Sequence, residues 1–429
     1  MSHFFEIKEH KVESQHIREY AHATAHSQEE VLYLAVKQYI PKSNPNPQPG
    51  DVTLIAAHAN GFPKELYEPL WADLVTSLSA HNIGVRGIWI ADVTHQGQSA
   101  ILNERNLGND PSWIDHARDL LHLTNVFRAE MPRPLIGVGH SFGANIIVNL
   151  SLFHPRLLSS LILLDAVLSR FSSKGPKYGF QPMLASAHRR DLWPSRSAAV
   201  EAFKKNKFYS TWDKRCFDLW CEHGLRDVPT AIYPSAPAGA VTLLTTKHME
   251  SFTYYRPTAQ AISPITGERV LDYAKIPDAD EVVFSNPDFP FYRPEGSQTA
   301  NKLPFVRPGC LWIFGADSNV NPHDVRQEKL ELTGTGPGGS GGAKKGRVEI
   351  ETIEGYGHLV PMEQTTQCAE FAARFIAKDL KYWKEEQEEF ERYWKTKKDE
   401  EKWVLPEDFM KWMGGKPSRG KKVEEKGKL

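Results

Sequence analysis

The sequence of 429 residues contains few cysteines, only Cys216, Cys221, Cys310 and Cys368. That number is too small for a disulfide framework in a chain of this length, so we expect free thiols. Cys216 and Cys221 lack the spacing of a zinc-binding or redox CxxC motif, and no other His, Cys, Asp or Glu residues have metal-ligand spacing. Neither glycine-rich phosphate-binding pattern, GxGxxG or the P-loop, stands between a strand and a helix. The sequence therefore predicts no metal and no cofactor.

The chain also lacks an excess of charge of either sign. Lys and Arg total 52 and Asp and Glu total 53, for a formal net charge of −1. Proteins that bind nucleic acid carry a basic domain or stripe, so we expect no nucleic-acid partner. No apolar run reaches the ~18 residues of a transmembrane helix, and the first residues lack the apolar stretch of a secretory signal. We expect a soluble protein that is not secreted.

Short apolar runs, each ending in a polar or glycine-containing turn, dominate much of the sequence. Such runs are typical of strands buried on both faces of a parallel sheet. Segments with helical spacing lie between them, as at 112–127, where Ser112 is a plausible N-cap, and at 144–153. Strands that alternate with helices predict an α/β fold. The expected buried strands lie at 52–58, 85–92, 135–141, 158–165, 310–317 and 347–354, and 31–40 is an expected edge strand.

The alternation stops at Asp165 and resumes at Cys310, which leaves a long segment of different character. An insertion of this size between core strands is typical of a cap or lid. The glycine-rich stretch 334–346 predicts a flexible surface loop, and a long charged helix is expected from Glu363 to about Lys402. The predicted parts are a core in two pieces, 1–165 and 306–375, a cap at 166–305, and a charged helix with a disordered tail at 376–429.

Gly139-His140-Ser141-Phe142-Gly143 matches the GxSxG motif and stands between an expected strand and an expected helix. In that context the glycines permit a sharp turn that exposes the serine hydroxyl at the end of the strand. The N-terminus of the following helix favours negative charge that develops there. We therefore interpret Ser141 as a catalytic nucleophile rather than a residue of an ordinary turn.

A serine nucleophile requires a base and an acid that orients the base, in the chain order Ser, Asp or Glu, His for this motif. His358 lies in a glycine-flanked loop after the last expected strand and is our candidate base. Two carboxylates end strands at the expected catalytic edge. We favour Asp317, which follows the strand beginning at Cys310, over its rival Asp165.

Acyl transfer also needs hydrogen-bond donors for the oxyanion. His58-Ala-Asn-Gly61 follows the first buried strand, where one backbone N–H of such a site is expected. We expect the amide of Asn60, or that of Ala59, to act with the amide of Phe142. An ordinary tight turn at Asn60-Gly61 is compatible with the same residues.

These features resemble the α/β-hydrolase superfamily over about 52–375. The strings beginning at His58 (HANGFPKELYEPLW) and Asp92 (DVTHQGQSA), followed by Leu107-Gly-Asn-Asp-Pro-Ser-Trp113, resemble one fungal branch. That branch includes a yeast peroxisomal lipase and hydrolases of host-selective toxin biosynthesis. The resemblance implies an α/β-hydrolase fold and hydrolysis of a carboxylic ester or lipid.

The leading functional hypothesis is a serine hydrolase that cleaves an apolar acyl ester through an acyl-enzyme. A thioesterase and a carbon–carbon bond hydrolase use the same triad and stay open. A ligand-binding protein that keeps the fold without activity is the alternative from another class. Aromatic side chains of the cap either line the substrate site or pack among themselves: Phe171, Phe180, Trp193, Phe208, Trp212 and Phe252.

The chain ends in Gly427-Lys428-Leu429, which is similar to the Ser-Lys-Leu peroxisomal address but departs from it at the first position. The expected location is therefore the peroxisomal matrix or the cytoplasm. The corresponding partner is the peroxisomal import receptor, and the alternative is an ordinary charged tail.

Overall fold

The computed structural model describes residues 3–168, 180–257, 263, 265–268 and 291–414. The chain divides into two compact units, Met1–Leu380 and Lys381–Leu429. The predicted peroxisomal signal and disordered tail lie outside the described residues, as does Phe171. In the described part of the chain, none of the helices combines the length and apolar character needed to cross a membrane.

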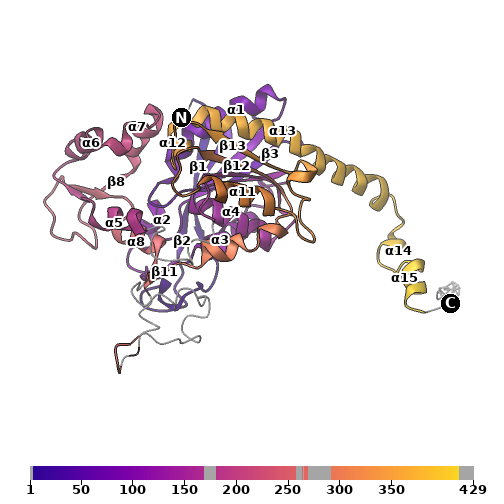
Figure 1. The fold of residues 1–429 in the computed structure, drawn as a ribbon, viewed down its shortest axis with the longest axis horizontal. Helices are drawn as coiled ribbons and strands as arrows, with labels where there is room; N and C mark the ends of the chain where they lie inside the picture. The colour runs from indigo at the N-terminus through magenta and orange to yellow at the C-terminus, as the bar shows by residue number, and fades with distance from the viewer. Residues whose placement is uncertain (1–2, 169–179, 258–262, 264, 269–290, 415–429) are drawn as a thin grey trace, which may run out of the picture. The chain divides into compact units, whose positions relative to one another are not determined.

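An eight-stranded sheet forms the centre of the first unit (Figure 1). Its order is β1-β2-β4-β3-β5-β6-β12-β13, and all pairings from β4 to β13 are parallel. The strands at the middle of the sheet are buried along their whole length, as their continuous apolar runs predict. The α/β fold class is confirmed. The strands are β1 (Phe5–Glu13), β2 (Tyr33–Pro41), β3 (Val52–Ala57), β4 (Val85–Ala91), β5 (Leu135–His140), β6 (Leu158–Leu164), β12 (Gly309–Gly315) and β13 (Val348–Ile353).

The expected edge strand at 31–40 is wrong in its position, because β2 has a neighbour on both sides. β1 pairs antiparallel with β2 from Phe5 opposite Pro41 to Glu13 opposite Tyr33. The residues of β1, FEIKEHKVE, are mostly charged or polar, and they alternate with few apolar positions. A strand at the edge of a sheet tolerates such a sequence because one side of it faces solvent, so the apolar pattern gave no signal.

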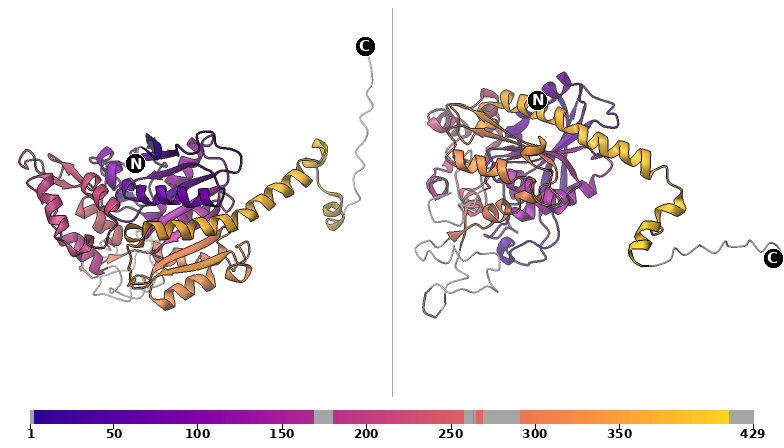
Figure 2. Two further views of the ribbon diagram at one scale, coloured as in Figure 1. Left: turned by 90° about the horizontal axis from the view of Figure 1, so that it is seen from above. Right: turned by 45° about the vertical axis from the view of Figure 1, so that its right-hand side comes forward.

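Helices cover both faces of the sheet (Figures 1 and 2). Apolar residues of α1 and of the first part of α13 pack on one face, and those of α3 and α4 pack on the other. The Ser112 hydroxyl accepts a hydrogen bond from the N–H of Ile114, so the predicted N-cap of α3 is confirmed. The helices outside the insertion are η1 (Ala21–Ala23), η2 (Lys64–Tyr67), α1 (Glu68–Ala80), α2 (Gly97–Leu102), α3 (Trp113–Val126), α4 (Phe142–Phe153), α11 (His323–Leu332), η7 (Ala343–Lys345), α12 (Val360–Glu363) and α13 (Thr365–Glu389).

The insertion lies between β6 and β12 and contributes elements of its own. Its interior is aromatic, with Trp193, Phe203, Tyr209 and Trp220 buried together. Its described elements are α5 (Phe180–His188), β7 (Leu192–Trp193), α6 (Arg196–Lys204), η4 (Lys207–Tyr209), α7 (Lys214–His223), β8 (Leu225–Asp227), β9 (Val241–Leu243), α8 (Lys247–Tyr254), β10 (Arg256–Pro257), β11 (Phe291–Tyr292), α10 (Glu295–Ala300) and η6 (Leu303–Phe305).

Two sequence expectations about non-core segments need correction. The stretch 334–346 is not a loose loop, because Gly341 N–H donates to Gly334 and Ser340 N–H donates to Val306. The long charged helix does not continue to Lys402, because Lys398 has extended backbone angles that separate two helices. The second unit begins within the last turns of α13 and continues with the π-helix η8 (Phe390–Trp394), α14 (Asp399–Lys402) and α15 (Glu407–Trp412).

Candidate active site

Ser141 occupies the turn between β5 and α4, with backbone angles φ 59° and ψ −122°. A non-glycine residue rarely adopts a positive φ, and strained turns of this kind mark functional positions. A Cβ atom at Gly143 would lie 2.4 Å from the carbonyl oxygen of Ala57. Only glycine therefore allows α4 to start directly against the end of β3, as the GxSxG interpretation requires.

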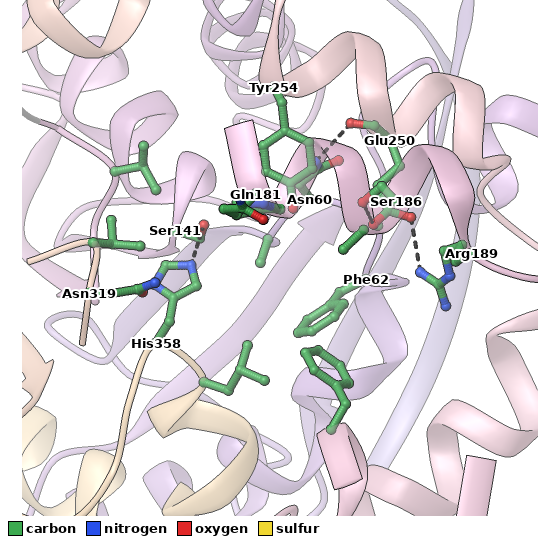
Figure 3. Close-up of a pocket in the computed structure, with 18 of the residues that line it drawn as sticks. Asn60, Phe62, Ser141, Gln181, Ser186, Arg189, Glu250, Tyr254, Asn319 and His358 are labelled. Atoms are coloured by element: carbon green, nitrogen blue, oxygen red, sulfur yellow. Dashed lines mark hydrogen bonds and ion pairs between the residues drawn. The ribbon is translucent and has the colours of Figure 1, made fainter. Parts of the chain in front are cut away.

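His358 reaches Ser141 from the loop after β13 (Figure 3). Its Nε2 lies 2.9 Å from Ser141 Oγ, and its Nδ1 lies 2.8 Å from Asp165 Oδ1. The His358 loop packs tightly on the end of β12, where a Cβ atom at Gly315 would lie 2.1 Å from the carbonyl oxygen of Gly357. Residues from the ends of β5, β6 and β13 thus form one continuous hydrogen-bonded chain.

The expectation that Asp317 orients His358 is wrong in geometry, because Asp165 makes that contact. Asp317 is exposed, and its backbone N–H donates to the carbonyl oxygen of Tyr356 at 2.9 Å. That contact holds the two loops together through their backbones. Asp165 is fully buried, and its N–H donates to the carbonyl oxygen of Ile313 in β12. The carboxylate beside the base therefore comes from β6, next to the strand that carries Ser141.

Donors from the end of β12 and from the loop after it surround the Asp165 carboxylate. Ser318 Oγ and Asn321 Nδ2 donate to Oδ1 at 2.8 Å and 2.7 Å, and Gly315 N–H donates to Oδ2 at 3.1 Å. Burial by itself raises the pKa of Asp165. The hydrogen bond from His358, its charge and the bonds from Ser318 and Asn321 outweigh burial and hold that pKa below its ordinary value. These contacts favour the ionised form of Asp165 beside the His358 ring.

A buried lysine supports this carboxylate indirectly. Lys329 Nζ donates to the Asn321 side-chain oxygen and, at 2.9 Å, to the carbonyl oxygen of Ala166. The first contact fixes the Asn321 amide so that its nitrogen points to Asp165. Burial lowers the pKa of Lys329 to about 7, although the charge of Asp165 acts in the opposite direction.

Two of the expected oxyanion donors lie close to Ser141: Asn60 lines the same cavity, and Phe142 follows Ser141 in the chain. Within the described residues, the N–H groups of Asn60 and Phe142 have no protein acceptor. The expectation for Ala59 is wrong, because its N–H already donates to the Tyr67 hydroxyl at 2.8 Å. Of the three amides expected to bind an oxyanion, those of Asn60 and Phe142 are therefore the ones without a protein acceptor in the described part of the chain.

His140 and Tyr67 form a second buried network behind the site. The Tyr67 hydroxyl lies 2.8 Å from His140 Nδ1, and His140 Nε2 lies 3.1 Å from the carbonyl oxygen of His358. Burial lowers the pKa of His140 to about 3, with the nearby His358 acting in the same direction. A neutral His140 satisfies every group in this network. It donates a hydrogen bond from Nε2 to the carbonyl oxygen of His358 and accepts one at Nδ1 from the Tyr67 hydroxyl. The network thereby fixes the backbone of His358.

A cavity of about 750 Å³ opens in front of Ser141 and His358. Core residues such as Phe62 and Trp113 line it together with the insertion residues Phe208 and Trp220. Trp193 and Trp212, which were also candidates, pack in the aromatic interior of the insertion instead. Among the residues that the structure describes, no group of three or more His, Cys, Asp or Glu could hold a metal ion.

Four residues of the site were not predicted from the sequence: Ser318, Asn321, Lys329 and Tyr67. Each is a common residue that acts through another side chain, so no motif marks it. Their contacts depend on the pairing of β12 with β6 and β13, which local sequence does not specify.

Comparison with known proteins places this geometry in a family of hydrolases. The model of the alpha/beta hydrolase family matches residues 54–374. A protein of Penicillium brevicompactum named Type I acyl-CoA thioesterase mpaH' is 40% identical, with 99% of each chain covered. The protein of that type from Penicillium roqueforti is 38% identical over the same shares. An abhydrolase domain-containing protein of Alternaria alternata, AFT2-1, is 26% identical over 58% of this chain and 85% of its own length.

Among solved structures, the peroxisomal α/β-hydrolase Lpx1 of Saccharomyces cerevisiae has a similar fold. Its TM-score is 0.64 at 17% identity, with 87% of this chain and 90% of that chain covered. The fungal resemblance of the loop sequences is confirmed by these relatives.

Proposed function

Since the chain belongs to the α/β-hydrolase family and is a serine hydrolase of esters or thioesters, we propose that its physiological substrate is an acyl-CoA thioester. The main support is the 40% identity, over 99% of both chains, to a fungal protein named as a Type I acyl-CoA thioesterase. The structural observation that carries the proposal is the hydrogen-bonded chain Ser141–His358–Asp165 at the wall of a cavity large enough for an acyl group.

In the proposed mechanism, Ser141 Oγ attacks the thioester carbonyl and gives its proton to His358 Nε2. Asp165 stabilises the imidazolium that forms. The N–H groups of Asn60 and Phe142 stabilise the tetrahedral oxyanion. The carbon–sulfur bond then breaks, and the proton from His358 goes to the leaving sulfur, which yields free CoA and an acyl-Ser141 ester.

Deacylation repeats these steps with water in place of Ser141. His358 Nε2 takes a proton from the attacking water, and the second tetrahedral oxyanion occupies the same donors. Collapse of this species returns the proton to Ser141 Oγ and releases the carboxylic acid. No further group is needed for the balance of atoms and protons.

We further propose that residues 166–305 act as a cap over this site, with 376–429 as a separate extension. The support is that the cavity has residues from α5, η4, α7 and α8 of the insertion in its wall. A cap that supplies part of the wall selects substrates by the shape of their acyl group.

Release of CoA thiol from a series of acyl-CoA substrates tests the proposal, with p-nitrophenyl esters of the same acyl groups as the comparison. The proposal expects wild-type protein to turn over thioesters and Ser141→Ala to lose at least about 10⁴-fold in rate. Turnover of the oxygen esters alone would contradict the acyl-CoA proposal and indicate an esterase. An inert Ser141 toward fluorophosphonate, with ligand binding intact, would support the non-catalytic alternative.

We propose the peroxisomal matrix as the location, with the cytoplasm as the alternative, and the import receptor as partner. The support is the C-terminal Gly427-Lys428-Leu429, whose last two residues match the receptor-read address. A fluorescent protein carrying the last dozen residues should enter peroxisomes, and the same fusion without Leu429 should stay in the cytoplasm. Equal distribution of the two fusions would contradict this proposal.

A further inference from the structure

The cavity wall is not uniformly apolar, because one part of it carries a cluster of polar side chains. Figure 3 shows Ser186, Arg189 and Glu250 together on one side of the cavity, with Ser141 and His358 on the other side. Phe62 lies between these two groups in the same view. The polar cluster therefore faces the space that an acyl group bound to Ser141 would occupy.

The three side chains hold one another in a fixed arrangement. Ser186 Oγ donates to Glu250 Oε1 at 2.6 Å, and Arg189 Nη1 donates to Glu250 Oε2 at 3.1 Å. Both carboxylate oxygens are thus occupied, and the Glu250 side chain is only 10% exposed. Arg189 is different, because a guanidinium has five N–H donors, and its partners here are the Glu250 carboxylate and the Tyr209 hydroxyl. These two partners leave further donors of Arg189 for a ligand. The Arg189 side chain keeps 26% of its surface exposed where it lines the cavity.

A plain alkyl chain would be a poor occupant of this part of the cavity. It would exclude water from the remaining Arg189 donors and offer them no acceptor, which costs free energy for every donor left unpaired. An oxygen atom on the acyl group would accept those hydrogen bonds. The neighbouring Tyr209 stays a neutral phenol, because burial raises its pKa to about 12.

The charge of the cluster indicates whether the oxygen group on the substrate is neutral or ionised. Arg189 and Glu250 carry opposite charges and together are neutral. A carboxylate on the acyl group would be buried beside the Glu250 carboxylate and would be repelled by it. A neutral hydroxyl or carbonyl oxygen meets the donors of Arg189 without that repulsion.

We infer that Arg189, held by Glu250 and Ser186, forms a subsite for a neutral oxygen function on the acyl group of the substrate. This inference rests on the proposed acyl-transfer function of Ser141. It makes the substrate an oxygenated acyl thioester rather than a simple fatty acyl thioester.

The chain offers a matched control in the next residue. Arg190 is exposed, its Nε donates to the carbonyl oxygen of Leu192 at 2.9 Å, and its guanidinium lies 5.6 Å from the Trp193 ring. It does not belong to the cavity lining. Arg190→Met therefore removes the same charge from the same segment without touching the subsite.

The experiment measures kcat/KM for matched acyl thioesters and p-nitrophenyl esters that are unsubstituted, hydroxylated or carboxylated at their distal end. For wild-type protein and Arg190→Met, we expect the best hydroxylated substrate to exceed its unsubstituted match by about 10- to 100-fold. Arg189→Met should bring that ratio close to one, and Arg189→Lys should restore part of it. Thermal unfolding of each variant identifies any loss of folded protein.

Three outcomes would overturn the inference: a wild-type ratio near one, a ratio that survives Arg189→Met, or a preference for the carboxylated substrate. Failure of acyl transfer at Ser141 looks different, because then no substrate of either series is turned over. Turnover of the oxygen esters alone would remove the acyl-CoA proposal, and the oxygen preference would still be measured with the esters. Turnover without an oxygen preference would leave the hydrolase intact and remove only the subsite.

Discussion

His358 Nδ1 lies 2.8 Å from Asp165 Oδ1, although the two residues are 193 positions apart in the sequence. The other ring nitrogen of His358 lies 2.9 Å from Ser141 Oγ. Ser141 N–H in turn donates to the carbonyl oxygen of Leu164, the residue before Asp165. Ser141 and Asp165, the proposed nucleophile and acid, are thus positioned by the neighbouring strands β5 and β6, and His358 joins them from the loop after β13.

Replacement of Asp165 by Asn should lower kcat by about 10⁴-fold, because the amide leaves the shape intact but favours the wrong tautomer of the histidine. Asp317→Asn, a matched change at an exposed position, should stay within about twofold of wild type. Steady-state hydrolysis by the two variants, measured side by side, checks this prediction. A large loss in Asp317→Asn with a normal Asp165→Asn would reverse the assignment.

Local sequence patterns predicted Ser141 and His358 but could not decide between Asp165 and Asp317. Ser141 and His358 are recognisable because each sits in a local pattern, GxSxG or a glycine-flanked loop after a strand. Asp165 and Asp317 both follow apolar runs that end at the same edge of the sheet, so local sequence does not separate them. The difference arises from contacts between segments far apart in the chain: the Asp317 backbone holds the His358 loop, and Ser318 and Asn321 donate to Asp165.

The fold was predictable where burial dictates the sequence. Strands buried on both faces, such as β3 and β12, are continuous apolar runs. β1 was not predicted, because an edge strand does not require a continuous apolar run. The sequence also could not show that the Ala59 N–H is already used, because its acceptor, the Tyr67 hydroxyl, is brought to it only by the fold.

Replacement of Lys329 by Met should lower kcat about 10-fold or more and leave the protein folded. The methionine can occupy the space near the Trp312 and Phe314 rings, but it no longer fixes the Asn321 amide that donates to Asp165. Kinetics together with urea unfolding check the prediction. Lys344→Met, at an exposed position, is the control and should be normal. A wild-type kcat in Lys329→Met would show that Asn321 keeps its orientation without the lysine.

Tyr67→Phe should destabilise the protein by about 1–3 kcal/mol, because it leaves the Ala59 N–H and His140 Nδ1 buried without a partner. It should also lower kcat, since His140 holds the backbone of His358. Urea unfolding and kinetics measure the two effects. Tyr393→Phe in the second unit, where the side chain is exposed, should change neither quantity. Equal stability of the Tyr67 and Tyr393 variants would contradict the proposed network.

Acid should destabilise the protein between about pH 6.5 and pH 4. Burial lowers the pKa of His58 to about 4 and that of His140 to about 3, while an unfolded histidine titrates near ~6.5. In this window the unfolded chain binds more protons than the folded chain, so stability falls as the pH falls. Each residue should account for about 2–3 kcal/mol of loss at pH ~4.5. Urea unfolding across this range checks the sign, and His140→Gln should have a shallower slope. Parallel curves for the variant and wild type would rule out His140 as a source of the effect.

The central claim is that Ser141 carries the acyl group between the thioester and water. Rapid quenching of the protein during turnover of an acyl-CoA, followed by peptide mass spectrometry, tests it most directly. We expect the mass of the acyl group, without CoA, on the peptide that contains Ser141, and no such mass in Ser141→Ala. An acyl adduct on one of the four cysteines, or continued turnover by Ser141→Ala, would contradict it.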